Sequence, residues 1–219
     1  MTDQDLRRGS VPPASAIADV LALWRRDGWL SPPLASIVPA AAAVAGTARV
    51  LTLGHGASGA GLGPLYDVLD ADLTGQALVL AGAHTTPGAV WGEILAATAA
   101  GSHAAVVLVD GAVRDVDDLP ATPLYARGTN VVGPNGRAHV IAVDEAALIG
   151  EVGIDSGDTV VADATGCVRI TSGDRERVLE AAGFYADAED RVLDAVRSGT
   201  PLAEAYLIKK TAVDQLRKG

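Results

Sequence analysis

Residues 76–115 read QALVLAGAHTTPGAVWGEILAATAAGSHAAVVLVDGAVRD, and this stretch decides the fold class of the chain. Residues 76–81 and 104–109 are short, continuous apolar runs, which are typical of strands buried on both faces. Residues 89–100 lie between them and predict a helix. A strand, a helix and a strand in this order form a βαβ unit, in which a right-handed crossover joins two parallel strands. The sequence therefore predicts an α/β protein built around this unit.

Elements of both kinds are predicted on either side of this stretch. Helical spacing of apolar residues predicts a helix over residues 10–29 and a longer one over residues 174–197, followed by a short helix after Pro201. Further strands are predicted at residues 48–53, 139–143, 159–162 and 167–170. Neither a linker nor an internal repeat is evident in the sequence. We therefore expect a single domain over residues 1–219, with a C-terminal helical extension from about residue 173.

The amino-acid composition limits the binding partners and the cellular compartment that we expect for this protein. The formal net charge of −10 disfavours binding to nucleic acid, because an acidic surface repels phosphate backbones. The longest apolar stretch, residues 37–45, is too short for a membrane span, and residues 1–12 lack the apolar core of a secretory signal. Cys167 is the only cysteine, which excludes an intramolecular disulfide and suits a reducing compartment. We expect a cytoplasmic protein without membrane or nucleic-acid partners.

Two glycine-containing segments are candidates for ligand binding. Residues 54–63 are rich in glycine, but no Gly-Lys-Ser/Thr follows them, so we interpret them as a flexible loop rather than a phosphate loop. Residues 88–93 join a strand end to a helix start, where free backbone N–H groups and the helix dipole favour a carboxylate or a phosphate. The alternative is that Gly88 and Gly92 only permit a turn and close packing.

A charged pair follows the next strand of the βαβ unit. Arg114 can bind a carboxylate in bidentate fashion, and Asp115 offers a hard oxygen ligand for Mg²⁺ or Mn²⁺. The alternative is a simple surface ion pair. Twenty residues separate Glu93 from Arg114, which one helix and one strand account for. Both segments should therefore lie at the same end of neighbouring parallel strands, where α/β folds bind their ligands.

The combined pattern is Gly-x-x-x-Gly-Glu, twenty residues, Arg-Asp and a further Asp. It comprises Gly88, Gly92, Glu93, Arg114, Asp115 and Asp118. This pattern resembles the signature of the RraA-like family, which includes class II 4-hydroxy-4-methyl-2-oxoglutarate and 4-carboxy-4-hydroxy-2-oxoadipate aldolases and the regulator of ribonuclease E activity. The segments PLYARG (residues 123–128) and SGDTVVADATG (residues 156–166) also resemble segments of that family, and the resemblance extends over residues 11–207. Glu93 is a departure, since aspartate is more frequent there in the aldolases.

The resemblance implies a fold, an assembly and a carboxylate site. The fold is a compact, layered α/β/α sandwich-like domain, and the assembly is a homotrimer or a hexamer with the site near a subunit interface. The backbone of Gly92, Glu93, Ile94 and Leu95 is expected to hold the carboxylate of a 2-oxo acid substrate.

The resemblance also implies roles for three side chains. Arg114 is expected to bind the oxo and carboxylate oxygens and to stabilise an enolate. Asp115 is expected to hold Mg²⁺ or Mn²⁺, largely through water molecules, and Glu93 to orient or deprotonate one of these waters. The implied activity is metal-dependent C–C bond cleavage of a 2-oxo acid, as an aldolase, an oxaloacetate decarboxylase or both.

Two other functions stay open at this point. The chain could be a non-catalytic regulator of a protein partner, because that branch of the family shares the Arg-Asp pair. It could also be a repurposed enzyme that uses the same site on a larger substrate, in which case residues 54–63 and 133–137 would matter most. His84 precedes the glycine segment and could face the site, whereas Cys167 is expected in the core.

Overall fold

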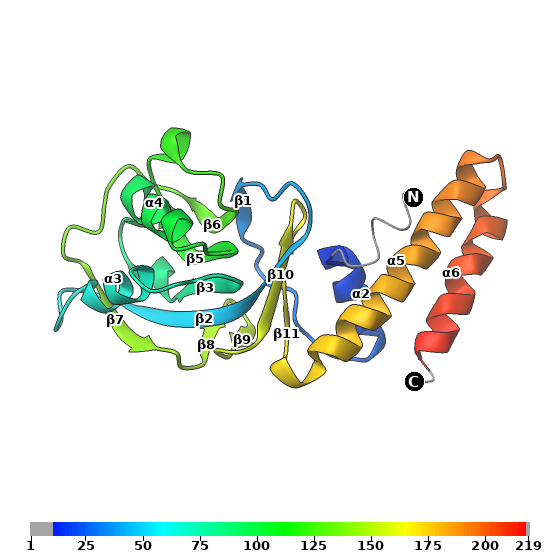
Figure 1. Ribbon diagram of the computed structural model, residues 1–219, viewed down its shortest axis with the longest axis horizontal. Helices are drawn as coiled ribbons and strands as arrows, with labels where there is room; N and C mark the ends of the chain where they lie inside the picture. The colour runs from blue at the N-terminus through cyan, green and yellow to red at the C-terminus, as the bar shows by residue number, and fades with distance from the viewer. Residues whose placement is uncertain (1–10, 218–219) are drawn as a thin grey trace.

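The computed structural model describes residues 11–217 and shows an elongated molecule, with a mixed sheet at one end and three helices at the other (Figure 1). The elements of the sheet end are β1 (Ala35–Val38), β2 (Val44–His55), α3 (Gly63–Leu69), β3 (Gln76–Ala81), β4 (Ala89–Trp91), α4 (Glu93–Gly101), β5 (Val106–Val113), β6 (Leu124–Thr129), β7 (Ala138–Val143), β8 (Ala147–Ile149) and β9 (Val152–Ile154). The remaining elements are α2 (Ala14–Leu23), β10 (Thr159–Asp163), β11 (Gly166–Ile170), α5 (Arg175–Arg197) and α6 (Leu202–Leu216). The strand order is β1-β6-β5-β3-β2-β10-β11, with β4 beside β5 and β7 beside β2.

The predicted βαβ unit is confirmed. β3 and β5 are parallel neighbours, in register from Ala77 opposite Val106 to Leu80 opposite Val109, and α4 connects them. The predicted helix start at residue 89 is wrong, since Ala89–Trp91 forms β4 and the helix begins at Glu93. β4 forms because β5 continues beyond the end of β3 and offers its free edge to this apolar tripeptide.

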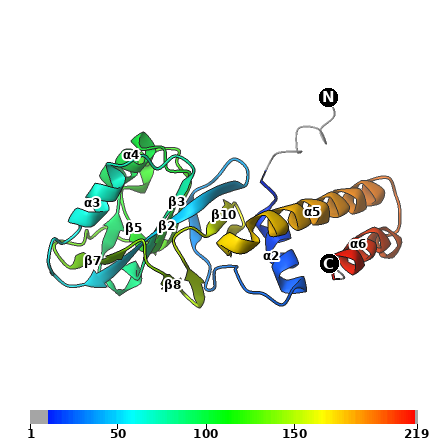
Figure 2. The ribbon, with the colours of Figure 1, turned by 60° about the horizontal axis from the view of Figure 1, so that its bottom comes forward.

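The two faces of the sheet are covered differently. α3 and α4 pack on one face, and the β8–β9 hairpin lies on the other (Figure 2). Leu65 and Ala99 belong to the core under the helices, whereas Ile149 and Ile154 belong to the core under the hairpin. The predicted α/β class, with a layered sheet and C-terminal helices, is confirmed.

At the far end α2 and α5 pack against one side of the β10–β11 hairpin, and α6 packs against α5. The two strands of the hairpin match those predicted at residues 159–162 and 167–170. α2 is shorter than the predicted helix over residues 10–29, because Arg25 adopts the left-handed conformation, with φ of 56°, just beyond its end. Residue 10 itself lies outside the described residues. Cys167 is buried in the core as predicted, and burial raises the pKa of its thiol. Between residues 11 and 217, no helix has the length and apolar character that a bilayer span requires.

Candidate functional site

The predicted meeting of the glycine segment and the Arg-Asp pair is found at the ends of β4 and β5. Trp91 lies opposite Val113 in the parallel pair, and the Arg114 N–H donates a hydrogen bond to the Trp91 carbonyl oxygen at 3.0 Å. Gly92, which follows Trp91, is therefore held beside Arg114, which follows Val113. A Cβ atom added to Gly92 would lie 2.9 Å from Asp115 Oδ2 and 3.0 Å from Arg114 Cγ. This close approach gives Gly92 a specific reason to lack a side chain.

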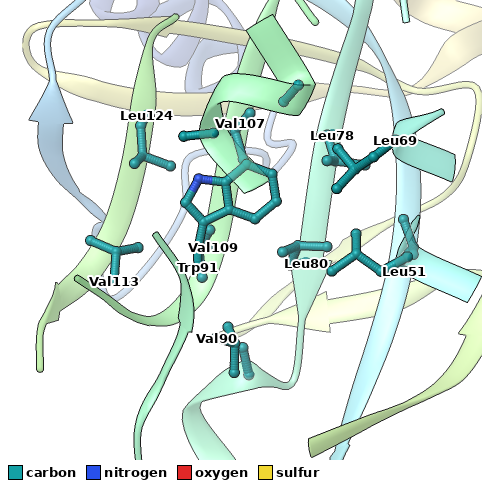
Figure 3. Close-up of a cluster of buried hydrophobic side chains, with 14 of the residues drawn as sticks. Leu51, Leu69, Leu78, Leu80, Val90, Trp91, Val107, Val109, Val113 and Leu124 are labelled. Atoms are coloured by element: carbon teal, nitrogen blue, oxygen red, sulfur yellow. The ribbon is translucent and has the colours of Figure 1, made fainter. Parts of the chain in front are cut away.

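Trp91 fixes the position of this junction. Its side chain is fully buried, and the indole lies among Val107, Val109 and Leu124 beneath α4 (Figure 3). Val90 is also buried in the same core. β4 is thus anchored through its side chains as well as its backbone, and it carries the start of α4 to the end of β5. A rigid support of this kind is what a precisely placed binding site requires.

The Arg-Asp pair lies at the surface. Arg114 Nε is 3.3 Å from Asp115 Oδ2, and the two side chains are 44% and 43% exposed. Asp115 adopts the left-handed backbone conformation, with φ of 55°, which its short polar side chain tolerates better than most. It precedes a 3₁₀ turn, Val116–Asp118, and the motif residue Asp118 is exposed at the end of that turn.

A cavity of ≈440 Å³ opens beside the pair, between α3, α4 and β4. Its lining comprises Leu62, Tyr66, Leu69, Asp70, Ala89, Val90, Trp91, Gly92, Ile94, Leu95, Thr98, Arg114 and Pro134. The predicted site residues Gly92, Ile94, Leu95 and Arg114 therefore contribute to one concave surface. Glu93 is exposed in the first turn of α4 and, like Asp115, does not line the cavity. The first N–H groups of α4 lack intrahelical acceptors, so this helix start can bind an anion.

Gly88 has a different role from Gly92. A Cβ atom on Gly88 would lie 2.8 Å from the Gly133 carbonyl oxygen, and the Ala89 N–H donates a hydrogen bond to the Val132 carbonyl oxygen at 2.7 Å. Gly88 thus permits close packing, as in the simpler of the two interpretations. The loop that it contacts brings Gly133 against the guanidinium, since a Cβ atom there would lie 3.4 Å from Arg114 Nη1.

Sequence reasoning missed a charged cluster around a buried aspartate of β5. Asp110 is fully buried, and its Oδ1 accepts a hydrogen bond from Arg127 Nε at 2.6 Å. Its Oδ2 accepts a hydrogen bond from the Gly82 N–H at 3.1 Å and lies 2.7 Å from His84 Nδ1. His84 therefore contacts Asp110 and does not line the cavity. The one available signal was an aspartate that ends the apolar run of β5.

The side chains at the site determine which cations it can hold. No group of three or more His, Cys, Asp or Glu side chains that could hold a metal ion occurs within residues 11–217. A closed zinc site is therefore not formed by these residues. Mg²⁺ and Mn²⁺ need fewer protein ligands, because such ions are often held by one or two carboxylates together with several waters. The half-exposed Asp115 carboxylate fits that mode of binding.

Two proteins of known sequence match parts of this chain. DlpA of Legionella pneumophila is 29% identical over 118 residues, which cover 53% of this chain and 19% of that protein. A protein of Halalkalibacterium halodurans, provisionally named 4-hydroxy-4-methyl-2-oxoglutarate aldolase, is 28% identical over 169 residues, or 76% of this chain and 78% of that protein. This chain thus spans only about a fifth of the length of DlpA but most of the second relative.

Solved structures show the same fold. An uncharacterized protein from Pseudomonas syringae superposes with a TM-score of 0.77 at 25% identity, covering 89% of this chain and 92% of that one. RraAS2 of Streptomyces coelicolor, described as an unusual member of the RNase ES inhibitor RraA family, has a TM-score of 0.72 at 22% identity, covering 86% of this chain and 96% of that one. The RraA-like family model, described as Aldolase/RraA, matches residues 14–169. The chain therefore belongs to the RraA-like family, which includes both aldolases and RraA regulators.

Proposed function

We propose that this protein is a divalent-metal-dependent lyase that cleaves a C–C bond of a 2-oxo acid through a pyruvate enolate, as an aldolase, an oxaloacetate decarboxylase or both. The observation that carries the proposal is the position of Gly92, whose missing side chain leaves room for both Arg114 and Asp115. A helix start and a guanidinium consequently line one cavity, and a carboxylate lies beside the guanidinium. The name of the halodurans relative supports the same class of reaction.

The chain's own groups account for binding of the substrate. The amides of Glu93, Ile94 and Leu95 open α4 and can donate to the C1 carboxylate. Arg114 can donate to the carboxylate and the 2-oxo oxygen, and its fixed positive charge becomes more valuable as the enolate forms. Since these donors are held by β4 and β5, little reorganisation is needed when the charge develops.

The carboxylates serve the cation and the proton. Asp115 is the residue that would hold Mg²⁺ or Mn²⁺, and the ion would supply Lewis-acid stabilisation of the enolate. Glu93 is an exposed carboxylate beside the helix start and can accept the proton that is released in aldol cleavage. The homotrimer or hexamer that the family resemblance implies remains part of the proposal, and light scattering on the purified chain tests it.

Pyruvate release from oxaloacetate tests the lyase. We expect turnover with Mg²⁺ above the rate of a protein-free blank, loss of turnover with EDTA, and loss in Arg114→Ala and Asp115→Ala. Asp117→Ala is a matched control, because Asp117 is an exposed carboxylate in the turn that follows Asp115, whereas Asp115 is the carboxylate that approaches Gly92 and Arg114. Metal-independent turnover, or full activity in the two site variants, would contradict the proposal.

Regulation of a protein partner is the second candidate. Ile94 and Val131 are 77% and 91% exposed, and both lie in segments that border the cavity. Exposed apolar side chains at one rim suit contact with another protein. Tight binding to an endoribonuclease, together with no turnover of any 2-oxo acid, would favour this function over the lyase.

A further inference from the structure

The cavity wall away from Arg114 is apolar. Leu62, Tyr66 and Leu69 contribute from α3 and its preceding turn, Leu95 contributes from α4, and Trp91 contributes from β4. These side chains belong to or pack against the core beneath the two helices, except for Tyr66, which is exposed enough to contact a ligand. A part of the substrate that extends beyond the carboxylate site therefore meets hydrocarbon and aromatic surface.

The charged side chains of the cavity lining also disfavour a second carboxylate on the substrate. Among the described residues that line the cavity, Arg114 is the single basic side chain, and Asp70 is the single acidic one. If Arg114 binds the C1 carboxylate and the 2-oxo group, no cation of this chain's lining remains for a second carboxylate. Such a group would lose hydration against apolar side chains and would be repelled by Asp70, and both effects are unfavourable.

We infer that the aldol substrate is a 4-hydroxy-2-oxo acid whose C4 substituent is an uncharged alkyl or aryl group, rather than a group that carries a second carboxylate. The inference rests on the proposed lyase function and specifies its substrate class. The volume of ≈440 Å³ lies within the range of roughly 300–1,000 Å³ that is typical of small-molecule sites, and it leaves space beyond a pyruvyl group. Tyr66, which is 50% exposed, adds aromatic surface, on which an apolar substituent is well accommodated.

The reaction balances without a further reactant. The 4-hydroxyl group loses its proton, and the C3–C4 bond breaks as the C4–O bond becomes a carbonyl. The electron pair of the broken bond passes to C3 and forms the pyruvate enolate. Protonation of C3 by water then gives pyruvate, and the other product is an uncharged aldehyde or ketone.

A pair of substrates tests the inference directly. Pyruvate release by the full-length protein with Mg²⁺ is compared for 4-hydroxy-2-oxo-4-phenylbutanoate and 4-hydroxy-4-methyl-2-oxoglutarate. We expect kcat/KM for the phenyl substrate to be higher by about tenfold or more, since burial of an apolar group of that size favours binding. Equal values, or a preference for the dicarboxylate, would overturn the inference.

A variant of the cavity wall gives a second test. Tyr66→Lys places a cation on the apolar wall and should shift the preference toward the dicarboxylate by about tenfold. Tyr206→Lys is the matched control, because Tyr66 and Tyr206 are both 50% exposed while Tyr206 lies on α6, at the opposite end of the molecule (Figure 1). An equal preference in both variants would overturn the inference.

Deuterium exchange separates this inference from the proposed function. Enolate formation from pyruvate exchanges its C3 protons with D₂O, and this step needs no C4 substituent. Exchange by the wild type, combined with a preference for the dicarboxylate, overturns the substrate class alone. No exchange overturns the lyase and the substrate class together.

Discussion

Two carboxylates near the end of β5 have opposite surroundings. Asp110 is fully buried, and both of its oxygens are held by partners that include Arg127 and the Gly82 N–H. Asp115 follows the same strand, but it is 43% exposed and its described ionic partner is the neighbouring Arg114, at 3.3 Å. Asp110 therefore has a partner for each of its oxygens, whereas Asp115, just beyond the same strand, can still bind a ligand.

This difference separates structural from functional roles. A buried carboxylate is tolerated when its charge and lone pairs are satisfied. Removal of that charge should therefore lower the free energy of unfolding, with little direct effect on the catalytic rate. An exposed pair contributes little to stability, so its cost of removal should appear in binding and turnover. The predictions below test this division, beginning with the largest expected effect.

Asp110→Asn should be the most destabilising change. The substitution leaves the Arg127 guanidinium without its buried counter-ion, and loss of one partner from such a pair costs about 3–5 kcal/mol. Urea denaturation measures the loss in free energy of unfolding. Asp115→Asn is the control with identical chemistry, and it should change stability by less than about 1 kcal/mol. Equal losses in the two variants would remove the distinction between the two carboxylates.

Arg114→Gln should show the opposite behaviour. It removes the cation that we propose to stabilise the enolate, so kcat/KM for pyruvate release should fall by about 10²-fold or more, while the urea midpoint stays nearly constant. Arg137→Gln is a suitable control, because Arg137 is exposed in the neighbouring loop and does not line the cavity. A fall of similar size in both variants would indicate a general charge effect instead of a specific contact.

The sequence predicts this junction well for physical reasons that are local. Apolar runs and their spacing are enough to predict β3, α4 and β5, and the carboxyl ends of parallel strands must share an edge. The amino-acid order alone therefore predicts that Gly92 and the Arg-Asp pair lie at the same edge of the sheet, whereas their direct contact depends on the pairing of β4 with β5. It does not reveal the role of Asp110, because that role depends on contacts with Arg127 and Gly82, which are brought close only by the tertiary arrangement.

The ends of two helices also differ from those predicted by the sequence. Ala89–Trp91 is compatible with the first turn of a helix, and its assignment as β4 depends on the free edge of β5. The predicted helix over residues 10–29 ends early for a reason that is equally hard to read from sequence, namely the left-handed conformation of Arg25. At β4 local preference is overridden by pairing with β5, whereas α2 ends with backbone hydrogen bonds from Arg25 and Arg26 to its own last turn.

Gly92→Ala tests the geometry of the rim with a moderate effect. The extended backbone of Gly92 is open to any residue, but the new methyl group would lie 2.9 Å from Asp115 Oδ2 and must displace that carboxylate. We expect less than about 1 kcal/mol of destabilisation, because the displaced carboxylate is half-exposed, together with a reduced response to Mg²⁺ in the oxaloacetate assay. Gly101→Ala at the other end of α4 is the matched control, because a Cβ atom there meets nothing within 4 Å. Reduced Mg²⁺ response in both variants would contradict this account of Gly92.

Substitution of Asp174, at the start of α5, should have the smallest effect on stability. It extends the comparison to a paired carboxylate near the surface. A hydrogen bond from the Thr171 hydroxyl, followed by the charge of Arg26, lowers the pKa of Asp174. A lowered pKa in the folded state means that the unfolded state binds more protons in the acid range, so the stabilisation is present above the unfolded pKa of about 3.9 and is lost as the pH falls through the folded value. Asp174→Asn should therefore lower the free energy of unfolding by less than about 1 kcal/mol at pH 7, and this difference from the wild type should shrink below about pH 4. Asp194→Asn is the control, since Asp194 and Arg197 are 73% and 69% exposed and 3.9 Å apart, and it should leave stability unchanged at both pH values. A constant difference across the acid range would show that the Asp174 side chain contributes through packing rather than through its charge.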